Sequence, residues 1–152
     1  MIVNSKFCVR LTRSKPLKII VSQLYKVISI EEQDDYQYTI TAVLHNESKY
    51  AVVANSATSA LHLACLALGL KKNDYLWTVP ITFIASANCG IYCGAKIDLV
   101  DINKDTFNID VKALEQKLQQ AKKKNKLPKI LIPVHLGGNP CELSEIKKLS
   151  KK

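Results

Sequence analysis

From residue 50 onward, the apolar positions of the chain alternate between short continuous runs and longer segments with helical spacing. The short runs, bounded by polar or Pro-containing turns, predict buried strands at Tyr50–Ala54, Tyr75–Val79, Lys96–Asp101 and Lys129–Val134. The longer segments predict helices at Ser59–Gly69, Phe83–Gly94, Asp110–Lys124 and Glu142–Lys151. Strands that alternate with helices in this way predict an α/β fold, with a mainly parallel sheet and helices on its faces.

The first 45 residues have a different pattern, without a strong helical period. Three runs there, Leu17–Val21, Tyr25–Ile30 and Tyr36–Leu44, predict strands, and a polar stretch separates the last two. We therefore divide the chain into a divergent N-terminal segment, residues 1–45, and an α/β region, residues 46–152.

Composition narrows the class of protein further. A length of 152 residues is enough for one domain with its own core, and 47% hydrophobic with 23% charged residues is typical of globular proteins. No apolar run reaches membrane-spanning length, and the N-terminus lacks the apolar core of a secretory signal. We expect a cytoplasmic protein.

The chain is basic, with a net charge of +9, and its lysines gather in two runs. These runs have no interleaved aromatic residues, which favours a solvated surface over nucleic-acid binding. The five cysteines are spaced without a matching His or second Cys pair, so we predict free thiols and no metal site. The lysines of the two runs are Lys122, Lys123, Lys124, Lys126 and Lys129, and Lys147, Lys148, Lys151 and Lys152. The cysteines are Cys8, Cys65, Cys89, Cys93 and Cys141.

The turn between the first predicted strand and helix, Asn55-Ser-Ala-Thr-Ser59, carries the strongest indication of chemistry. A helix start leaves backbone N–H groups without intrahelical acceptors and adds partial positive charge. The hydroxyls of Thr58 and Ser59 add donors, so the turn fits a phosphate group. The alternative is that these polar residues only cap the helix, which is their commonest role.

A second segment, Trp77–Asn88, places Phe83 after a predicted strand, where an aromatic ring can stack on a planar ligand. The alternative is that Phe83 belongs to the core. His135 follows the fourth predicted strand, where a single histidine is more often a hydrogen-bonded structural residue than a catalytic one.

Four blocks, taken in order, resemble the sugar aminotransferases of the DegT/DnrJ/EryC1/StrS family, over about residues 47–152. They are Asn55–Leu61, Trp77–Asn88, Gly94–Asn103 and Ile132–Gly138. The family consists of pyridoxal-phosphate enzymes of the aspartate aminotransferase fold (fold type I). The first block looks most like the branch that makes an amino-altrosamine nucleotide on the pseudaminic acid route.

The resemblance implies a role for each matched residue. Thr58 and Ser59 would hold the cofactor phosphate, Ala57 would lie beside the cofactor, and Ser56 would lie near the sugar substrate. Phe83 would stack on the pyridine ring. The implied reaction transfers an amino group, usually from glutamate, to a UDP-4-keto-6-deoxy-hexosamine, in an enzyme that is usually a homodimer. Asp101, in the third block, is expected to be structural.

The chain also departs from the family pattern. None of its lysines stands in the motif of the Schiff-base lysine, and neither the acidic block of the family nor the Leu-Thr-x-Gly segment is present. We therefore expect a fragment of the large domain, truncated before the lysine, from a divergent or frame-shifted gene, and inactive alone. Two alternatives stay open: a non-catalytic partner of a full-length relative, and a basic nucleic-acid-binding α/β domain.

Overall fold

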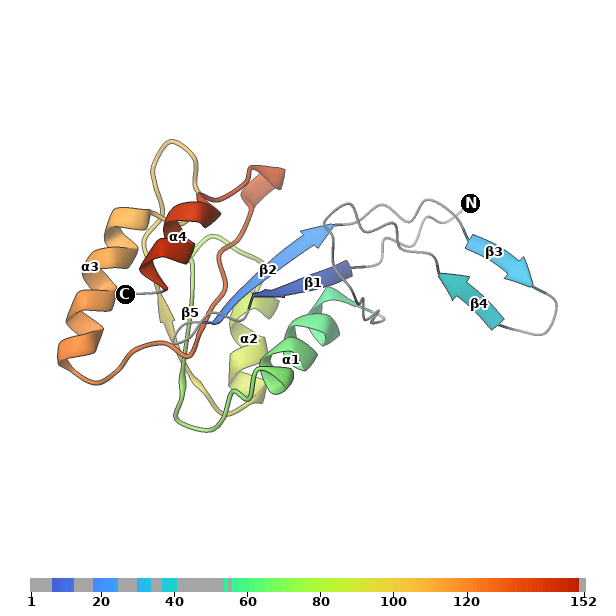
Figure 1. Ribbon diagram of the computed structural model, residues 1–152, viewed down its shortest axis with the longest axis horizontal. Helices are drawn as coiled ribbons and strands as arrows, with labels where there is room; N and C mark the ends of the chain where they lie inside the picture. Colours follow the sequence, from blue (N-terminus) through green and yellow to red (C-terminus); the bar gives the residue numbers. More distant parts are fainter. Residues whose placement is uncertain are drawn as a thin grey trace.

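The computed structural model describes residues 7–12, 18–24, 30–33, 37–40, 54 and 56–150 (Figure 1). Five strands form one sheet in the order β1-β2-β7-β5-β6, and β3 and β4 form a separate antiparallel pair. Within the larger sheet, β2–β7, β7–β5 and β5–β6 are parallel, and β1–β2 is antiparallel. The predicted α/β fold with a mainly parallel sheet is therefore confirmed.

The strands agree in part with the hydrophobic pattern. Their bounds are β1 Phe7–Thr12, β2 Lys18–Leu24, β3 Ile30–Gln33, β4 Gln37–Ile40, β5 Tyr75–Thr78, β6 Lys96–Leu99 and β7 Ile130–Leu131. The pattern missed β1, and the predicted strands Tyr25–Ile30 and Tyr50–Ala54 lie almost wholly outside the described residues. β7 is shorter than predicted because its ladders to β2 and β5 each hold only two residue pairs.

All four predicted helices are present; the first begins and ends two residues earlier than predicted, and the other three are shorter than their patterns. They are α1 Ala57–Ala67, α2 Ala85–Tyr92, α3 Val111–Lys123 and α4 Leu143–Leu149, with a 3₁₀ turn, η1, at Leu136–Gly138. The Asp110 carboxylate caps α3 by accepting the Ala113 N–H at 2.8 Å. Two lysines in the last turn of α3 complement the negative end of its dipole. No helix in the described part of the chain has the length and apolar character needed to cross a membrane.

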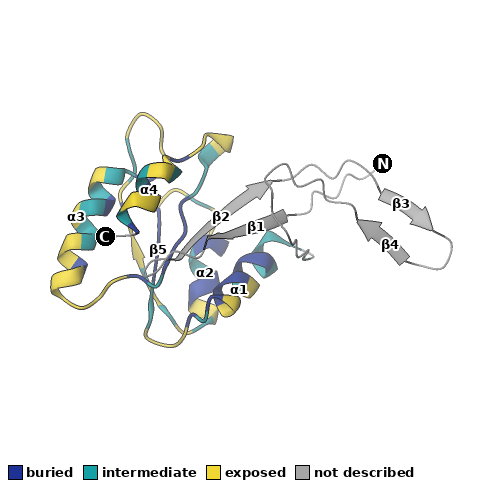
Figure 2. Ribbon diagram, in the orientation of Figure 1, coloured by how far each residue is buried: buried dark blue, intermediate teal, exposed yellow. Residues whose placement is uncertain are grey.

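Alternate residues of the central strands face two different cores. On β5, Leu76 packs with α1 and α2, whereas Trp77 packs with α3 and α4. On β7, Ile130 and Leu131 divide in the same way. Figure 2 shows the buried residues concentrated along β5 and on the sides of the helices that face the sheet. The sheet therefore separates an α1/α2 layer from an α3/α4 layer.

Gly90 allows α2 to lie close to the sheet. A Cβ atom at this position would come within 2.6 Å of Ile97 Cδ1 and 3.0 Å of Leu76 Cδ1. Both atoms are the ends of side chains, so a larger residue at this position would make these side chains shift, and glycine lets α2 pack closely on the strands without that shift.

Candidate cofactor site

The start of α1 is a capped helix terminus. Ser56 has extended backbone angles (φ −152°, ψ 158°), and its Oγ accepts the Ser59 N–H at 3.1 Å. The same hydroxyl donates to Ser59 Oγ at 3.0 Å. The capping role predicted for this turn is confirmed, and Ser56 is the residue that fills it. Asn55 lies outside the described residues.

The cap leaves several donors of the first turn available. The Ala57 and Thr58 N–H groups precede the first residue that can bond back along the helix, so helical geometry gives them no acceptor. Because Ser59 Oγ accepts from Ser56, the hydrogen of the Ser59 hydroxyl can be donated elsewhere. Ser56 through Ser59 are all partly exposed. The first turn of α1 contains no acidic residue, so nothing in that turn repels an anion.

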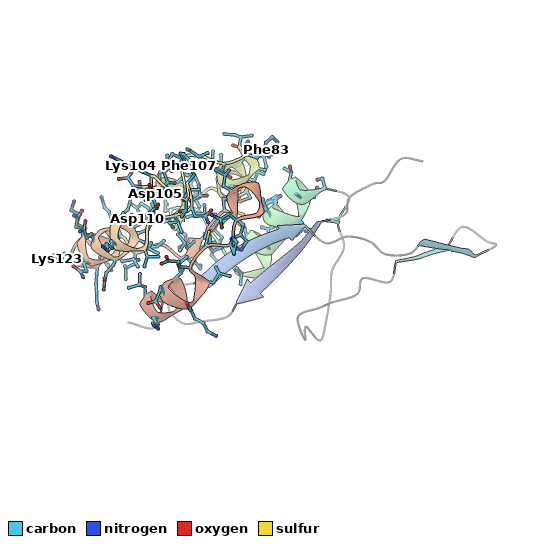
Figure 3. The ribbon with its side chains drawn as sticks, turned by 90° about the horizontal axis from the view of Figure 1, so that it is seen from above. Phe83, Lys104, Asp105, Phe107, Asp110 and Lys123 are labelled. Carbon is cyan, nitrogen blue, oxygen red and sulfur yellow. The ribbon has the colours of Figure 1, made fainter. Side chains whose placement is uncertain are left out.

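Phe83 lies in the loop between β5 and α2, and 74% of its surface is exposed. The alternative that Phe83 is a core residue is therefore wrong. Figure 3 shows it at the outer edge of the described side chains. Its neighbours Ile81 and Ile84 are 41% and 62% exposed, so the ring belongs to a bare apolar strip. Isolated exposed apolar residues are ordinary, but a contiguous strip of this kind marks a surface that contacts something.

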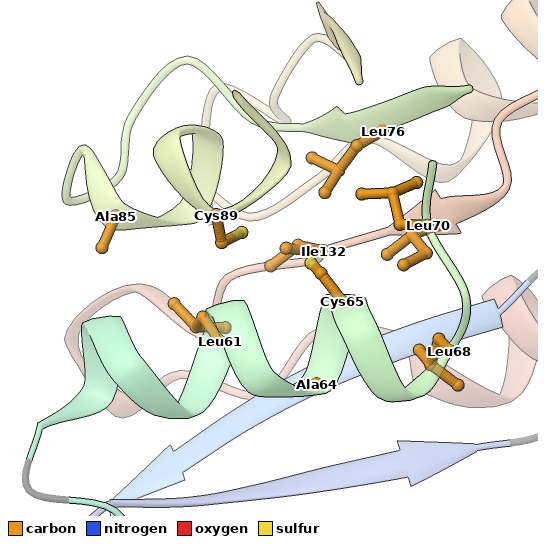
Figure 4. Close-up of a cluster of buried hydrophobic side chains, with 10 residues drawn as sticks. Leu61, Ala64, Cys65, Leu68, Leu70, Leu76, Ala85, Cys89 and Ile132 are labelled. Atoms are coloured by element: carbon orange, nitrogen blue, oxygen red, sulfur yellow. The ribbon is translucent and has the colours of Figure 1, made fainter. Parts of the chain in front are cut away.

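The helices α1 and α2 run in the same direction, and their N-terminal ends lie at the same end of the pair. In Figure 4, Leu61 and Ala85 lie toward one end, and Cys65 and Cys89 follow in the same direction along the two helices. Because α2 follows β5, this is also the end of the sheet at which the parallel strand β5 stops. The structure therefore brings the first turn of α1 and the Phe83 loop to the same, carboxyl end of the sheet, where ligands of α/β folds bind.

His135 lies just after β7. Its Nδ1 accepts the Cys141 N–H at 2.9 Å, which places the proton of the neutral ring on Nε2. Burial lowers the pKa of His135, so the ring is neutral near pH 7. Within the described residues, Nε2 is buried and has no hydrogen-bond partner. The contact with Cys141 agrees with the structural role expected for this histidine.

Asn108 is a positioning residue that the sequence pattern did not reveal. Its side chain is only 4% exposed; Oδ1 accepts the Leu136 N–H at 3.1 Å, and Nδ2 donates to the Asn139 carbonyl at 3.0 Å. Asn108 thus holds the loop that follows β7. Its partners lie 28 and 31 residues further along the chain, so no local pattern could have indicated the contact.

The third block, Gly94–Asn103, contains β6, which is parallel to β5, and its last residues follow the carboxyl end of that strand. Asp101 is exposed, and its carbonyl accepts the Asp110 N–H at 3.0 Å, which agrees with the structural role expected for it.

Two lysines of the basic runs form ion pairs: Lys148 Nζ lies 2.7 Å from Glu145 Oε1 on the same helix, and Lys129 is paired with a residue of another segment. Lys129 Nζ lies 2.7 Å from Asp74 Oδ2, and both side chains are about 30% exposed. Burial alone would raise the pKa of Asp74, but the hydrogen bond from Lys129 and further positive charge hold it below the usual value. The prediction of a freely solvated lysine was therefore wrong for Lys129, because its partner Asp74 lies in a distant part of the sequence.

The described cysteines are free thiols, as predicted. Cys65, Cys89 and Cys141 are buried, and Cys93 is partly exposed. Burial raises the pKa of Cys141 to about 11, which keeps this thiol protonated and unreactive at neutral pH. Among the described residues, no three His, Cys, Asp or Glu side chains gather closely enough to hold a metal ion.

The fold is that of one part of a fold type I aminotransferase. The sequence profile of the DegT/DnrJ/EryC1/StrS aminotransferase family matches residues 26–152. The chain belongs to this family.

Individual relatives support the same assignment. Over 104 residues (68% of this chain), it is 48% identical to a UDP-4-amino-4,6-dideoxy-N-acetyl-beta-L-altrosamine transaminase of Campylobacter jejuni. It is 40% identical over 104 residues to the uncharacterized protein MJ1066 of Methanocaldococcus jannaschii. The chain spans 26% and 25% of the lengths of these two relatives.

Two solved structures show the same fold. A family aminotransferase from Brucella abortus superposes with a TM-score of 0.59 at 28% identity, covering 62% of this chain and 26% of its own. The putative sugar aminotransferase Spr1654 from Streptococcus pneumoniae, in its PMP form, gives 0.53 at 31% identity, covering 62% and 22%. The family uses pyridoxal phosphate, and this second protein has been solved with the cofactor in both its PMP and PLP forms.

Proposed function

We propose that this chain supplies the phosphate-binding and ring-stacking part of a pyridoxal-phosphate site in a nucleotide-sugar aminotransferase. The observation that carries the proposal is the bare ring of Phe83 at the same end of the sheet as the capped start of α1. Membership of the aminotransferase family supports the class of reaction.

The donors at the start of α1 fit a phosphate. The Ala57 and Thr58 N–H groups and the hydroxyls of Thr58 and Ser59 are all donors on a turn without acidic residues. The exposed face of Phe83 suits a planar pyridine ring, and an aromatic contact of this kind fixes the tilt of the ring. When bound, the cofactor supplies the electron sink that lets an amino group pass from an amino acid to a keto sugar. The chain's own residues bind its phosphate, orient its ring and present it at the edge of the sheet.

The substrates proposed follow the altrosamine branch of the family: glutamate as amino donor and a UDP-4-keto-6-deoxy-hexosamine as acceptor, with Ser56 close to the sugar. The 48% identity to the Campylobacter jejuni transaminase supports this choice. We propose that the lysine that links the cofactor covalently comes from outside these 152 residues. Alone, the chain then binds the cofactor weakly and does not turn over.

Pyridoxamine phosphate is the appropriate probe, because it cannot react with the many surface lysines. Calorimetric titration into the chain should give saturable binding, and Thr58→Val should weaken it about tenfold, since one hydrogen bond to a charged phosphate is worth about 1.4 kcal/mol or more. Phe83→Leu, which keeps an apolar side chain but removes the π face, should also weaken it.

Matched controls are available in the chain. Ser144→Ala removes an exposed hydroxyl from α4, and Phe107→Leu removes a 48% exposed ring from another loop. Neither should alter binding of pyridoxamine phosphate. Equal affinity in the Thr58 and Phe83 variants would reject the site.

We also propose a second candidate function, in which the chain pairs with a full-length relative and completes the site of that subunit, as the dimers implied by the family resemblance would allow. It predicts that the chain restores turnover when mixed with a full-length relative whose cofactor-linking lysine has been replaced. If the chain neither co-purifies with that relative nor restores its turnover, the partner function is rejected.

A further inference from the structure

The single tryptophan of the chain, Trp77, has an unusual environment. Its side chain is 1% exposed, and within residues 56–150 its Nε1–H has no hydrogen-bond acceptor. Buried donors almost always have a partner, because water is lost without replacement when they do not.

Trp77 borders a hollow of about 500 Å³ between the β5–β6 edge of the sheet and α3. This volume is in the range of small-molecule sites. The hollow lies on the α3/α4 side of the sheet, whereas Leu61 and Ala85, which lie near the proposed cofactor end, pack on the other side. Figure 3 shows Lys123, at the end of α3, well away from Phe83. The hollow is therefore separate from the cofactor site.

One wall of the hollow is already charge-balanced. Lys117 Nζ lies 2.7 Å from Asp98 Oδ1, also donates to the Leu99 carbonyl, and lies 5.2 Å from the centroid of the Trp77 ring. The lysine thus covers one face of the indole by a cation–π contact and satisfies the nearby carboxylate.

The remaining polar lining is rich in donors. Gln116, Gln120, Lys124 and Lys126 face a single further carboxylate, Asp101. With Lys117 and Asp98 paired, the hollow retains two ammonium groups against one carboxylate, together with two amides. A lining of this kind suits an anion with several acceptor oxygens.

We propose that the hollow binds a small multivalent organic anion, a carboxylate or a phosphate ester, through the ammonium groups of Lys124 and Lys126 and the amides of Gln116 and Gln120. Its position away from the cofactor end makes it an auxiliary site, and its occupancy does not depend on the proposed aminotransferase function.

Because Trp77 is the only tryptophan, its fluorescence reports directly on the hollow. Citrate and inorganic pyrophosphate, titrated separately at constant ionic strength, distinguish the carboxylate from the phosphate source. We expect a saturable change in Trp77 emission with at least one of them. In the double variant Lys124→Gln/Lys126→Gln, the affinity should fall at least tenfold.

The double variant Lys147→Gln/Lys148→Gln is the matched control, since it removes the same charge from exposed positions on α4. It should leave the titration unchanged, as should Thr58→Val, which affects only the proposed cofactor site. No saturable change with either anion, or equal losses in both lysine pairs, would overturn the proposal.

Discussion

The substitution Ser56→Asp separates the two roles open to the start of α1. Aspartate caps helices as well as serine does, and its charge favours a helix N-terminus by about 0.5 kcal/mol. The carboxylate can accept the Ser59 N–H that Ser56 Oγ now accepts at 3.1 Å. If the turn is only a cap, the variant should therefore be as stable as the parent or slightly more stable.

If the same turn holds a phosphate, the added carboxylate lies about two hydrogen bonds from its oxygens, roughly 6 Å away. A single charge and a dianion at that separation in water repel each other by about 1.4 kcal/mol, or about tenfold in affinity. Salt should reduce the effect, because the groups are partly exposed.

The assay combines urea unfolding with calorimetric titration of pyridoxamine phosphate, at low and at physiological salt. Ser144→Asp, on an exposed position of α4, controls for the change in net charge. We expect retained stability, about tenfold weaker binding in Ser56→Asp and no change in Ser144→Asp. Unchanged affinity in a well-capped Ser56→Asp variant would refute the phosphate site and leave only the cap.

Two further predictions concern the loop after β7. Burial lowers the pKa of His135 below its ordinary value of 6.5, so the histidine binds a proton more readily in the unfolded chain than in the folded one. The free energy of unfolding should therefore fall as the pH drops below about 6.5. His135→Asn keeps an acceptor for Cys141 without titrating, so urea unfolding at pH 5 to 8 should show a shallower slope; an equal slope in both proteins would assign the effect elsewhere. Asn108→Ala removes two buried hydrogen bonds and should lower the free energy of unfolding by about 2 kcal/mol. Asn108→Asp should have a stability between those of the parent and the alanine variant. A change below about 0.5 kcal/mol in Asn108→Ala would contradict the role of Asn108.

The sequence predicted the repeating elements well because their periods are local. The helix over 110–124 follows from apolar residues at helical spacing after an aspartate cap, and the structure gives Val111–Lys123 with that cap. The helix predicted from Phe83 instead begins at Ala85. The residue before it, Ile84, offers no side-chain cap, so no capping residue marks this start in the sequence. Apolar character alone cannot place a helix start, which is why this boundary was misplaced.

The site residues also divide into those whose role follows from the local sequence and those whose role depends on the three-dimensional structure. The cap at Ser56 was predictable, because the acceptor and the N–H that it serves are three residues apart. The sequence left open whether Phe83 stacks on a ligand or packs in the core, since a single phenylalanine fits both roles, and its exposure beside Ile81 and Ile84 becomes visible only in three dimensions. Asn108 could not be found either, because its role consists wholly of long-range hydrogen bonds.

The cap and the phosphate cradle are compatible, and the geometry of Ser56 explains why. Ser56 Oγ accepts the Ser59 N–H and donates its own hydrogen to Ser59 Oγ. These two bonds leave the Ala57 and Thr58 N–H groups and the hydrogen of the Ser59 hydroxyl available to a ligand. A capped helix start therefore cannot by itself indicate or exclude a ligand. The neighbouring element supplies the second observation: among the described residues Phe83 is exposed, and we propose that a ligand joining it to the start of α1 has an anionic end and a flat apolar end. A phosphorylated pyridine has both ends.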